Sequence, residues 1–230
     1  MQLDGLEITL RFSSRRKSIG LMVTTDGQAV VTAPRGTSEA KIREALNRHR
    51  RWLARKIAAS REAWSQLQDG VVYFQGRPYR LTTAWGEKAE VALMPGERAE
   101  IKITRPGAAV PVWPILLAWY LRQAAPVFQE RANHYAARMG LSFIRLELRD
   151  WRRRWGECHP RDGVLRFNWR LILLPGESLD YVVVHELAHL TEPGHTARFW
   201  TRVGREMSDY AARRGWLNRY GSPFLLWQLF

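Results

Sequence analysis

The chain has 230 residues, of which 46% are hydrophobic and 25% charged, a composition typical of a folded protein with a substantial core. No apolar run approaches the roughly 20 residues needed to span a bilayer, and residues 1–10 lack a signal-peptide pattern. A membrane protein and an exported protein are therefore not expected. The single cysteine, Cys158, excludes an internal disulfide and fits a reducing compartment. We expect a cytoplasmic protein.

The charge is strongly basic, because the formal net charge is +14 and all but five of the 36 basic residues are arginine. Arginine binds phosphate through two hydrogen bonds, so this excess fits a phosphate-rich partner. The arginines are scattered along the chain, however, and a genome that favours arginine codons is the simpler explanation. Non-specific nucleic-acid binding is therefore kept as a hypothesis, and the oligomeric state is unknown.

The first 108 residues are dominated by short β-type runs that are separated by turn signals such as Asp26-Gly27. Strands are expected at 6–12, 19–24, 29–33, 71–74, 77–82, 89–94 and 100–104. Between the third and fourth strands, residues 38–60 carry apolar side chains at helical spacing and arginine or lysine elsewhere. This pattern predicts one basic helix, with Ser38 as its N-cap and His49 packed on its apolar side.

Residues 106–114 are predicted to be a linker, so we expect a mostly β N-terminal region at 1–108 and a second domain at 110–230. Helical spacing follows at 115–123 and 127–138, where Pro126 is expected to kink or restart the helix and Gly140 to end it. A strand is expected at 164–169, and it leads through 171–174 to the segment that follows. No internal repeat is evident, and the fold class is α+β, with a helix beside a small sheet in the second domain.

The segment 175–190 (PGESLDYVVVHELAHL) contains one H-E-x-x-H pattern, formed by His185, Glu186 and His189. Residues four apart project from one face of a helix, so the two imidazoles can share one metal ion. With 6 His and 15 Glu in the chain, about 0.01 such patterns are expected by chance. The opposite face is apolar, with Leu179, Val183, Leu187 and Leu190, and is expected to pack into the core.

Glu186 follows the first histidine and is expected to point beside the metal rather than at it. A carboxylate in that place suits a general base, because zinc lowers the pKa of water and polarises a carbonyl. A catalytic zinc needs a third protein ligand. His195, beyond the Pro193-Gly194 turn, is the expected one, and Glu192 is the alternative because a continuing helix would place it on the same face. Thr196 is predicted to cap a last helix.

The sequence resembles the YgjP-like metallopeptidases, bacterial relatives of the SprT-like proteases. The residues that carry the resemblance are Arg154 to Cys158, Leu165 to Leu173, Asp180 to Leu190, Gly194-His195 and Phe199-Trp200. The match is dense over about 144–203, with Glu157 where relatives commonly have serine. The resemblance implies a zincin-like domain, Zn²⁺ held by His185, His189 and His195, a catalytic Glu186, and protein or peptide substrates.

Three functions remain open from the sequence. The first is a zinc peptidase, and the second is a zinc hydrolase of another amide or ester, which needs the same residues. The third is a nucleic-acid-binding protein with a structural zinc. Glu186 disfavours the third, because a structural site needs a fourth protein ligand and no base. The strand at 164–169, if it lies beside the metal, offers backbone groups to an extended peptide.

Overall fold

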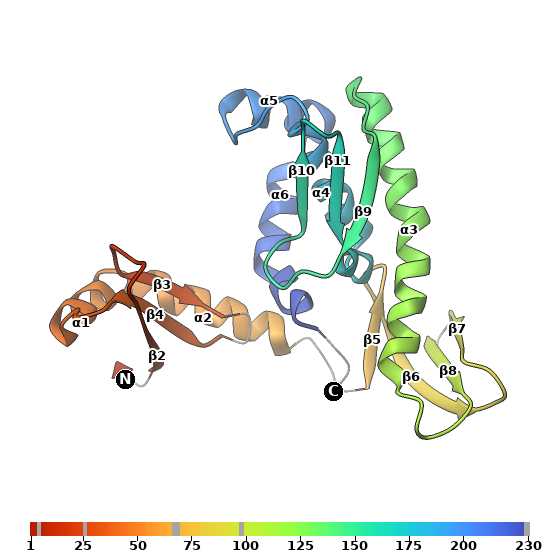
Figure 1. The fold of residues 1–230 in the computed structure, drawn as a ribbon, viewed down its shortest axis with the longest axis horizontal. Helices are drawn as coiled ribbons and strands as arrows, with labels where there is room; N and C mark the ends of the chain where they lie inside the picture. The colour runs from red at the N-terminus through yellow and green to blue at the C-terminus, as the bar shows by residue number, and fades with distance from the viewer. Residues whose placement is uncertain (4–5, 25–26, 66–69, 97–98, 228–230) are drawn as a thin grey trace. The chain divides into compact units, whose positions relative to one another are not determined.

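The computed structural model of the chain describes residues 1–3, 6–24, 27–65, 70–96 and 99–227, and these form an α+β fold (Figure 1). Contacts between residues divide the chain into two compact units. Unit 1 comprises Met1–Leu67 with Arg219–Pro223, and unit 2 comprises Gln68–Asn218 with Phe224–Phe230. The strands at 71–105 thus belong to the same unit as the H-E-x-x-H helix. The proposed division near residue 108 stays a prediction.

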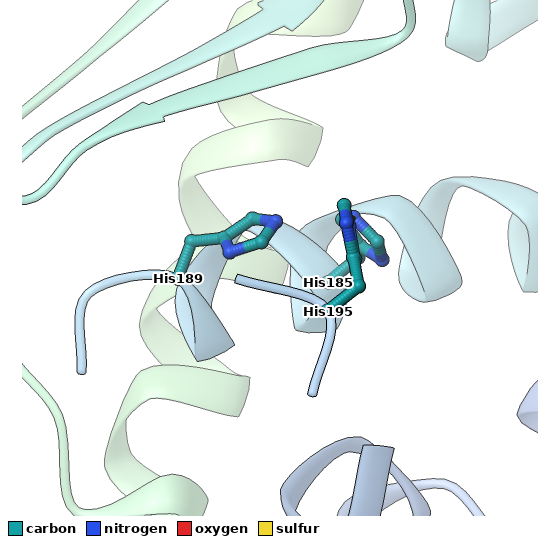
Figure 2. A group of neighbouring side chains, drawn as sticks. All are labelled: His185, His189 and His195. Carbon is teal, nitrogen blue, oxygen red and sulfur yellow. Dashed lines mark hydrogen bonds between the residues drawn. The ribbon is translucent and has the colours of Figure 1, made fainter. Parts of the chain in front are cut away.

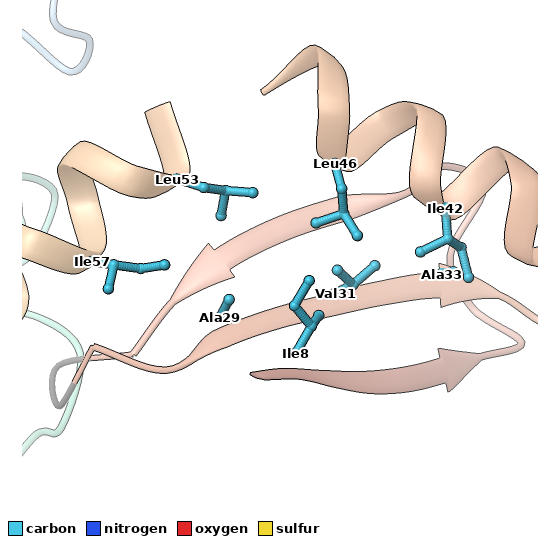
Figure 3. Close-up of a cluster of buried hydrophobic side chains, with 8 residues drawn as sticks. All are labelled: Ile8, Ala29, Val31, Ala33, Ile42, Leu46, Leu53 and Ile57. Carbon is cyan, nitrogen blue, oxygen red and sulfur yellow. The ribbon is translucent and has the colours of Figure 1, made fainter. Parts of the chain in front are cut away.

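Unit 1 is a four-stranded sheet with two helices packed on one face. The sheet order is β1-β2-β4-β3, in which β2 and β4 are parallel and the other pairs antiparallel. Alternate residues of β2 and β4 meet the apolar faces of the helices and form the core of the unit, which Figure 3 shows. The elements are β1 (Gln2–Leu3), β2 (Leu6–Ser13), β3 (Gly20–Val23), β4 (Ala29–Pro34), α1 (Glu39–Arg48) and α2 (Arg50–Ser65).

The single basic helix expected at 38–60 is two helices that meet at His49. His49 lies outside helical geometry, with φ −106° and ψ 14°, and its side chain is exposed rather than packed. Ser38 stands at the N-cap position of α1, but its side chain makes no capping hydrogen bond. The predicted apolar side of the helix is confirmed, since Ile42 and Leu46 of α1 and Leu53 and Ile57 of α2 are buried. The Asp26 half of the predicted turn lies outside the described residues.

Unit 2 begins with a second four-stranded sheet whose order, β5-β6-β8-β7, repeats that of the first sheet. Its central pair β6 and β8 is parallel and its outer pairs are antiparallel, as in unit 1. The sequence gives no sign of this repeat. The strands are β5 (Val71–Phe74), β6 (Arg77–Trp85), β7 (Glu90–Met94) and β8 (Glu100–Arg105).

A three-stranded sheet and four helices complete unit 2. The sheet order is β10-β11-β9, with β11 antiparallel to β10 and parallel to β9. Helix α3 packs against β7 and β8 and also against β9 and α4. The elements are α3 (Val112–Met139), β9 (Arg145–Arg149), β10 (Gly156–His159), β11 (Val164–Asn168), α4 (Gly176–Ala188), α5 (Ala197–Glu206) and α6 (Tyr210–Trp216), with a short helical turn at Trp169–Leu173. Two further turns, Leu217–Gly221 and Ser222–Leu225, each include residues of both units.

Of the two outcomes expected at Pro126, a kink or a restart, the restart does not occur, because helix α3 runs from Val112 to Met139. Pro126 and Arg122 are both exposed, so water can satisfy the Arg122 carbonyl that loses its partner. The strand predicted at 164–169 is confirmed as β11, which ends at Asn168, and a 3₁₀ turn of buried residues follows at Trp169–Leu173. Gly140 ends α3 in a left-handed conformation with φ 65°, as predicted.

Candidate metal centre

Helix α4 carries the H-E-x-x-H pattern through the core of unit 2. It starts at Gly176, after Pro175, and has Glu177 in its first turn, where a carboxylate interacts favourably with the helix dipole. Leu179, Val183 and Leu187 are buried as expected, whereas Leu190, beyond the helix, is half-buried. The residues between the three leucine and valine positions are buried too, except His185. The helix is therefore held by packing on nearly every face, so the side chains it presents have a rigid base.

Three imidazoles converge at the C-terminal end of α4 (Figure 2). His185 lies in the last turn of the helix, His189 is its C-cap, and His195 comes from the segment before α5. Ligand atoms of the three side chains all lie within 4.8 Å of one another, and Nε2 of His195 is 3.0 Å from Nε2 of His185. Zn–N bonds are about 2.0–2.1 Å long, so ligand atoms this close together could hold one metal ion.

The chain between His189 and α5 places His195 against the helix. The helix ends at Ala188, before Pro193-Gly194, and the chain then turns back. Thr196 caps α5, as predicted, by accepting a hydrogen bond at 3.4 Å from the backbone N–H of Phe199. Phe199 is fully buried, and its ring centre lies 4.5 to 4.9 Å from those of all three imidazoles. Sequence reasoning treated Phe199 only as core, and the structure shows that it also supports the histidine cluster.

Two neighbouring groups orient the imidazoles. Nδ1 of His189 lies 2.9 Å from the carbonyl oxygen of Glu192, so it donates to that oxygen and leaves Nε2 without a proton. The hydroxyl of Tyr181 lies 3.5 Å from Nδ1 of His185. Burial lowers the pKa of His185 to about 3, with contributions from His189, His195 and Arg214. Neutral imidazole is the form that binds a metal, so His185 is ready to do so at neutral pH.

Glu186 is buried beside the cluster, with only 6% of its surface exposed. Its carboxylate lies against the backbone of Gly156, the first residue of β10. Burial raises the pKa of Glu186 to about 8; the charge of Glu157 raises it further and Arg154 lowers it. A dication on the histidines would favour the ionised carboxylate and lower this pKa.

Glu192, the alternative third ligand, is oriented differently from His195. Its carboxylate lies 3.4 Å from Arg198, and only its main-chain oxygen meets His189. In the part of the chain that the structure describes, His185, His189 and His195 form the one group of three metal-ligating side chains.

Cys158 is half-buried, and burial raises the pKa of its thiol to about 12, with Glu186 adding to this. His159 lies 3.1 Å from a carboxylate oxygen of Glu157.

The strand beside the cluster is β10 and not the one expected from the sequence. Strand β11 (Val164–Asn168) is paired on both sides, so its backbone groups are not available to a ligand. Strand β10 is the edge of the described sheet, and it contacts α4 next to Glu186. The sequence analysis did not predict β9 or β10. Charged residues of these strands pair across the sheet, because Arg166 of β11 donates to Glu147 of β9 at 2.9 Å and to Glu157 of β10 at 3.4 Å.

The chain matches the model of a known protein family. The family described as YgjP-like, metallopeptidase domain, matches residues 17–220. The chain belongs to this family. The match covers most of unit 1 as well as the histidine cluster, so the YgjP-like region is longer than the segment 144–203 on which the sequence resemblance was densest. No helix among the described residues has the length and apolar character needed to cross a membrane.

Further comparisons add little to the YgjP-like assignment. No curated protein matches the chain. Among solved structures, the chain is similar to the metallopeptidase zymogen abylysin of Pyrococcus abyssi, at 18% identity and a TM-score of 0.36. That similarity covers 38% of this chain and 89% of the abylysin chain.

Proposed function

We propose that this YgjP-like metallopeptidase is a zinc enzyme that hydrolyses peptide bonds, with His185, His189 and His195 as ligands and Glu186 as general base. The observation that carries the proposal is the convergence of three imidazoles whose ligand atoms lie within 4.8 Å of one another. Three histidines leave one position of a tetrahedral ion open, which is typical of catalytic zinc. When bound, zinc supplies a Lewis acid that polarises the scissile carbonyl and makes water more acidic.

The surrounding residues support each of these roles. The hydrogen bond from His189 to the Glu192 carbonyl fixes one tautomer, and the burial of His185 keeps its ring neutral. Glu186 follows His185 on the same helix and cannot move towards β10, because the backbone of Gly156 blocks that direction. A carboxylate held in this way takes a proton from the attacking water and later delivers it to the leaving amine.

Strand β10 offers a way to hold the substrate. As the edge strand next to Glu186, it has backbone N–H and C=O groups that are free to pair with an extended peptide. Such pairing fixes the direction of the peptide and brings one peptide bond to the histidine cluster. A zincin-like arrangement, with an active-site helix beside a small sheet, follows from this proposal.

Two earlier predictions remain without a specific structural observation in their favour. Nucleic-acid binding rests on net charge alone, and within the basic helices Arg43 and Arg48 already pair with Glu39 and Glu44 at 2.8 and 2.7 Å. A cytoplasmic location also stays a prediction.

A zinc hydrolase that acts on another amide or ester needs the same residues, so only substrates can distinguish it from a peptidase.

The test is metal analysis combined with peptide digestion. We expect about one zinc per purified chain and cleavage of a mixed peptide library, lost after chelation and restored by zinc. A protein without bound metal, or a zinc-loaded protein that cleaves esters or non-peptide amides but no peptide, would contradict the proposal.

A further inference from the structure

An arginine outside the H-E-x-x-H segment lies close to the histidine cluster. Arg214 belongs to α6, and its guanidinium carbon is 4.6 Å from the centre of the Trp200 ring. Trp200 in turn stacks on His195, with ring centres 5.6 Å apart and an angle of 22° between planes. These two distances place the guanidinium carbon within about 10 Å of the centre of the His195 imidazole.

The aromatic neighbours hold Arg214 in this place. Trp200 also stacks on Tyr210, which lies one turn before Arg214 on α6, with ring centres 5.3 Å apart. Through Trp200 the guanidinium is thus held near the ring of His195, beside the histidine cluster.

Arg214 has no acidic partner in the part of the chain that the structure describes, although its neighbour does. Arg213 bonds to Asp209 at 2.9 Å, whereas Arg214 forms no ion pair with any described carboxylate. An exposed guanidinium without an acidic partner keeps its hydrogen-bond donors available for an anion that arrives with a ligand. The exposed side chain of Arg214 is free to meet one.

We propose that Arg214 recognises a carboxylate of the peptide substrate within about three residues of the scissile bond. The proposal rests on the peptidase function inferred above and adds a substrate class, peptides that are anionic near the cleavage site. The reach follows from geometry, since an extended chain advances about 3.3–3.6 Å per residue and the guanidinium lies within about 10 Å of His195. The planar guanidinium suits a carboxylate, which it binds through two parallel hydrogen bonds.

The carboxylate has two possible sources, the free C-terminus of a short peptide or the side chain of Asp or Glu. Three pools of N-acetylated hexapeptides distinguish them. The randomised positions of all three pools contain neither Asp nor Glu. One ends in a free carboxylate, one ends in a carboxamide, and one ends in a carboxamide with Glu fixed at position four. We expect the wild-type zinc protein to cleave one anionic pool at least about 10-fold faster than the neutral pool.

Three variants test the residue itself. Arg214→Gln should cleave all pools at the neutral-pool rate, while Arg214→Lys should keep part of the preference because it keeps the charge but not the paired hydrogen bonds. Arg213→Gln is the matched control, with the wild-type preference expected. The proposal is overturned if the wild-type protein cleaves all pools at the same rate. It is also overturned if Arg214→Gln lowers the cleavage rate equally for all pools, which would assign Arg214 to the transition state instead.

A binding measurement separates this proposal from the peptidase function. Equilibrium dialysis of the same pools against zinc-loaded Glu186→Gln protein requires no hydrolysis. If the Glu186→Gln protein retains an anionic pool and the Glu186→Gln, Arg214→Gln double variant does not, carboxylate recognition is supported. This holds even if no pool is cleaved, and in that case only the peptidase proposal fails. Equal retention of all pools by both proteins contradicts carboxylate recognition. Zinc content and thermal unfolding confirm that each variant is folded.

Discussion

Gly156 lies so close to Glu186 that any side chain at position 156 would collide with the carboxylate. A Cβ atom built on Gly156 would be 2.6 Å from Oε1 of Glu186 and 2.7 Å from its Cγ. The edge strand and the proposed general base are thus in direct contact. The glycine in the Trp-Gly-Glu-Cys segment therefore has a physical reason, which is space for Glu186 and not backbone freedom.

Gly156→Ala should reduce peptide hydrolysis by about 100-fold, because it displaces a catalytic group by a large fraction of an ångström. Zinc content should stay at the wild-type level, since no histidine moves. Gly176→Ala is the control, as a Cβ there meets nothing within 4 Å. Steady-state kinetics and metal analysis of both variants provide the measurement. Full activity in Gly156→Ala would show that Glu186 can be repositioned without cost.

Glu186→Gln should keep its zinc and lose hydrolysis by at least about 100-fold, because glutamine has the same shape but cannot accept the proton. Glu177→Gln, in the first turn of the same helix, should leave turnover unchanged. Turnover on a cleaved peptide and zinc content by elemental analysis decide this. Normal turnover in a zinc-loaded Glu186→Gln protein would remove Glu186 from the mechanism.

His195→Ala should weaken zinc binding by more than about 10-fold, whereas Glu192→Ala should change it little. The reason is that the imidazole of His195 meets His185 at 3.0 Å, while the carboxylate of Glu192 lies near Arg198. Competition with a coloured zinc chelator measures both affinities. The reverse order of the two effects would make Glu192 the ligand.

Asp150→Ala should destabilise the protein by about 1–3 kcal/mol, because it leaves the charge of Arg170 without its acidic partner. Arg170 is only 1% exposed; it pairs with Asp150 and donates to the carbonyl of Trp227 at 3.3 Å. Urea unfolding gives the free energy. The control is Glu39→Ala, which breaks an exposed pair and should cost about 0.5 kcal/mol or less. Equal effects of the two substitutions would contradict this account.

The convergence of the three histidines could be predicted from the sequence, because the signals for it are local. The spacing of His185 and His189 fixes their relation on a helix, and Pro193-Gly194 signals the turn that returns His195. The supporting residues could not be predicted in this way. The contact of Phe199 with all three imidazoles and that of Gly156 with Glu186 depend on how separate elements pack.

The errors in the fold have the same origin. No glycine or proline marks the break at His49, so the helical spacing of residues 38–60 predicts a single helix. Pro126 is a strong local signal, but it faces solvent and the packing of α3 on its other side keeps the helix intact. Tertiary contacts decided each of these cases.

Helix α3 has a consequence for the cooperativity of unit 2. Because the same 28-residue helix packs against β7 and β8 and against α4, local opening of either end removes support from the other. The second sheet and the helix that bears His185 should therefore belong to one unit of cooperative unfolding, and their slowest amide protons should exchange with a common free energy. Metal bound at the histidines would then slow amide exchange in β8, a strand that carries none of the proposed ligands.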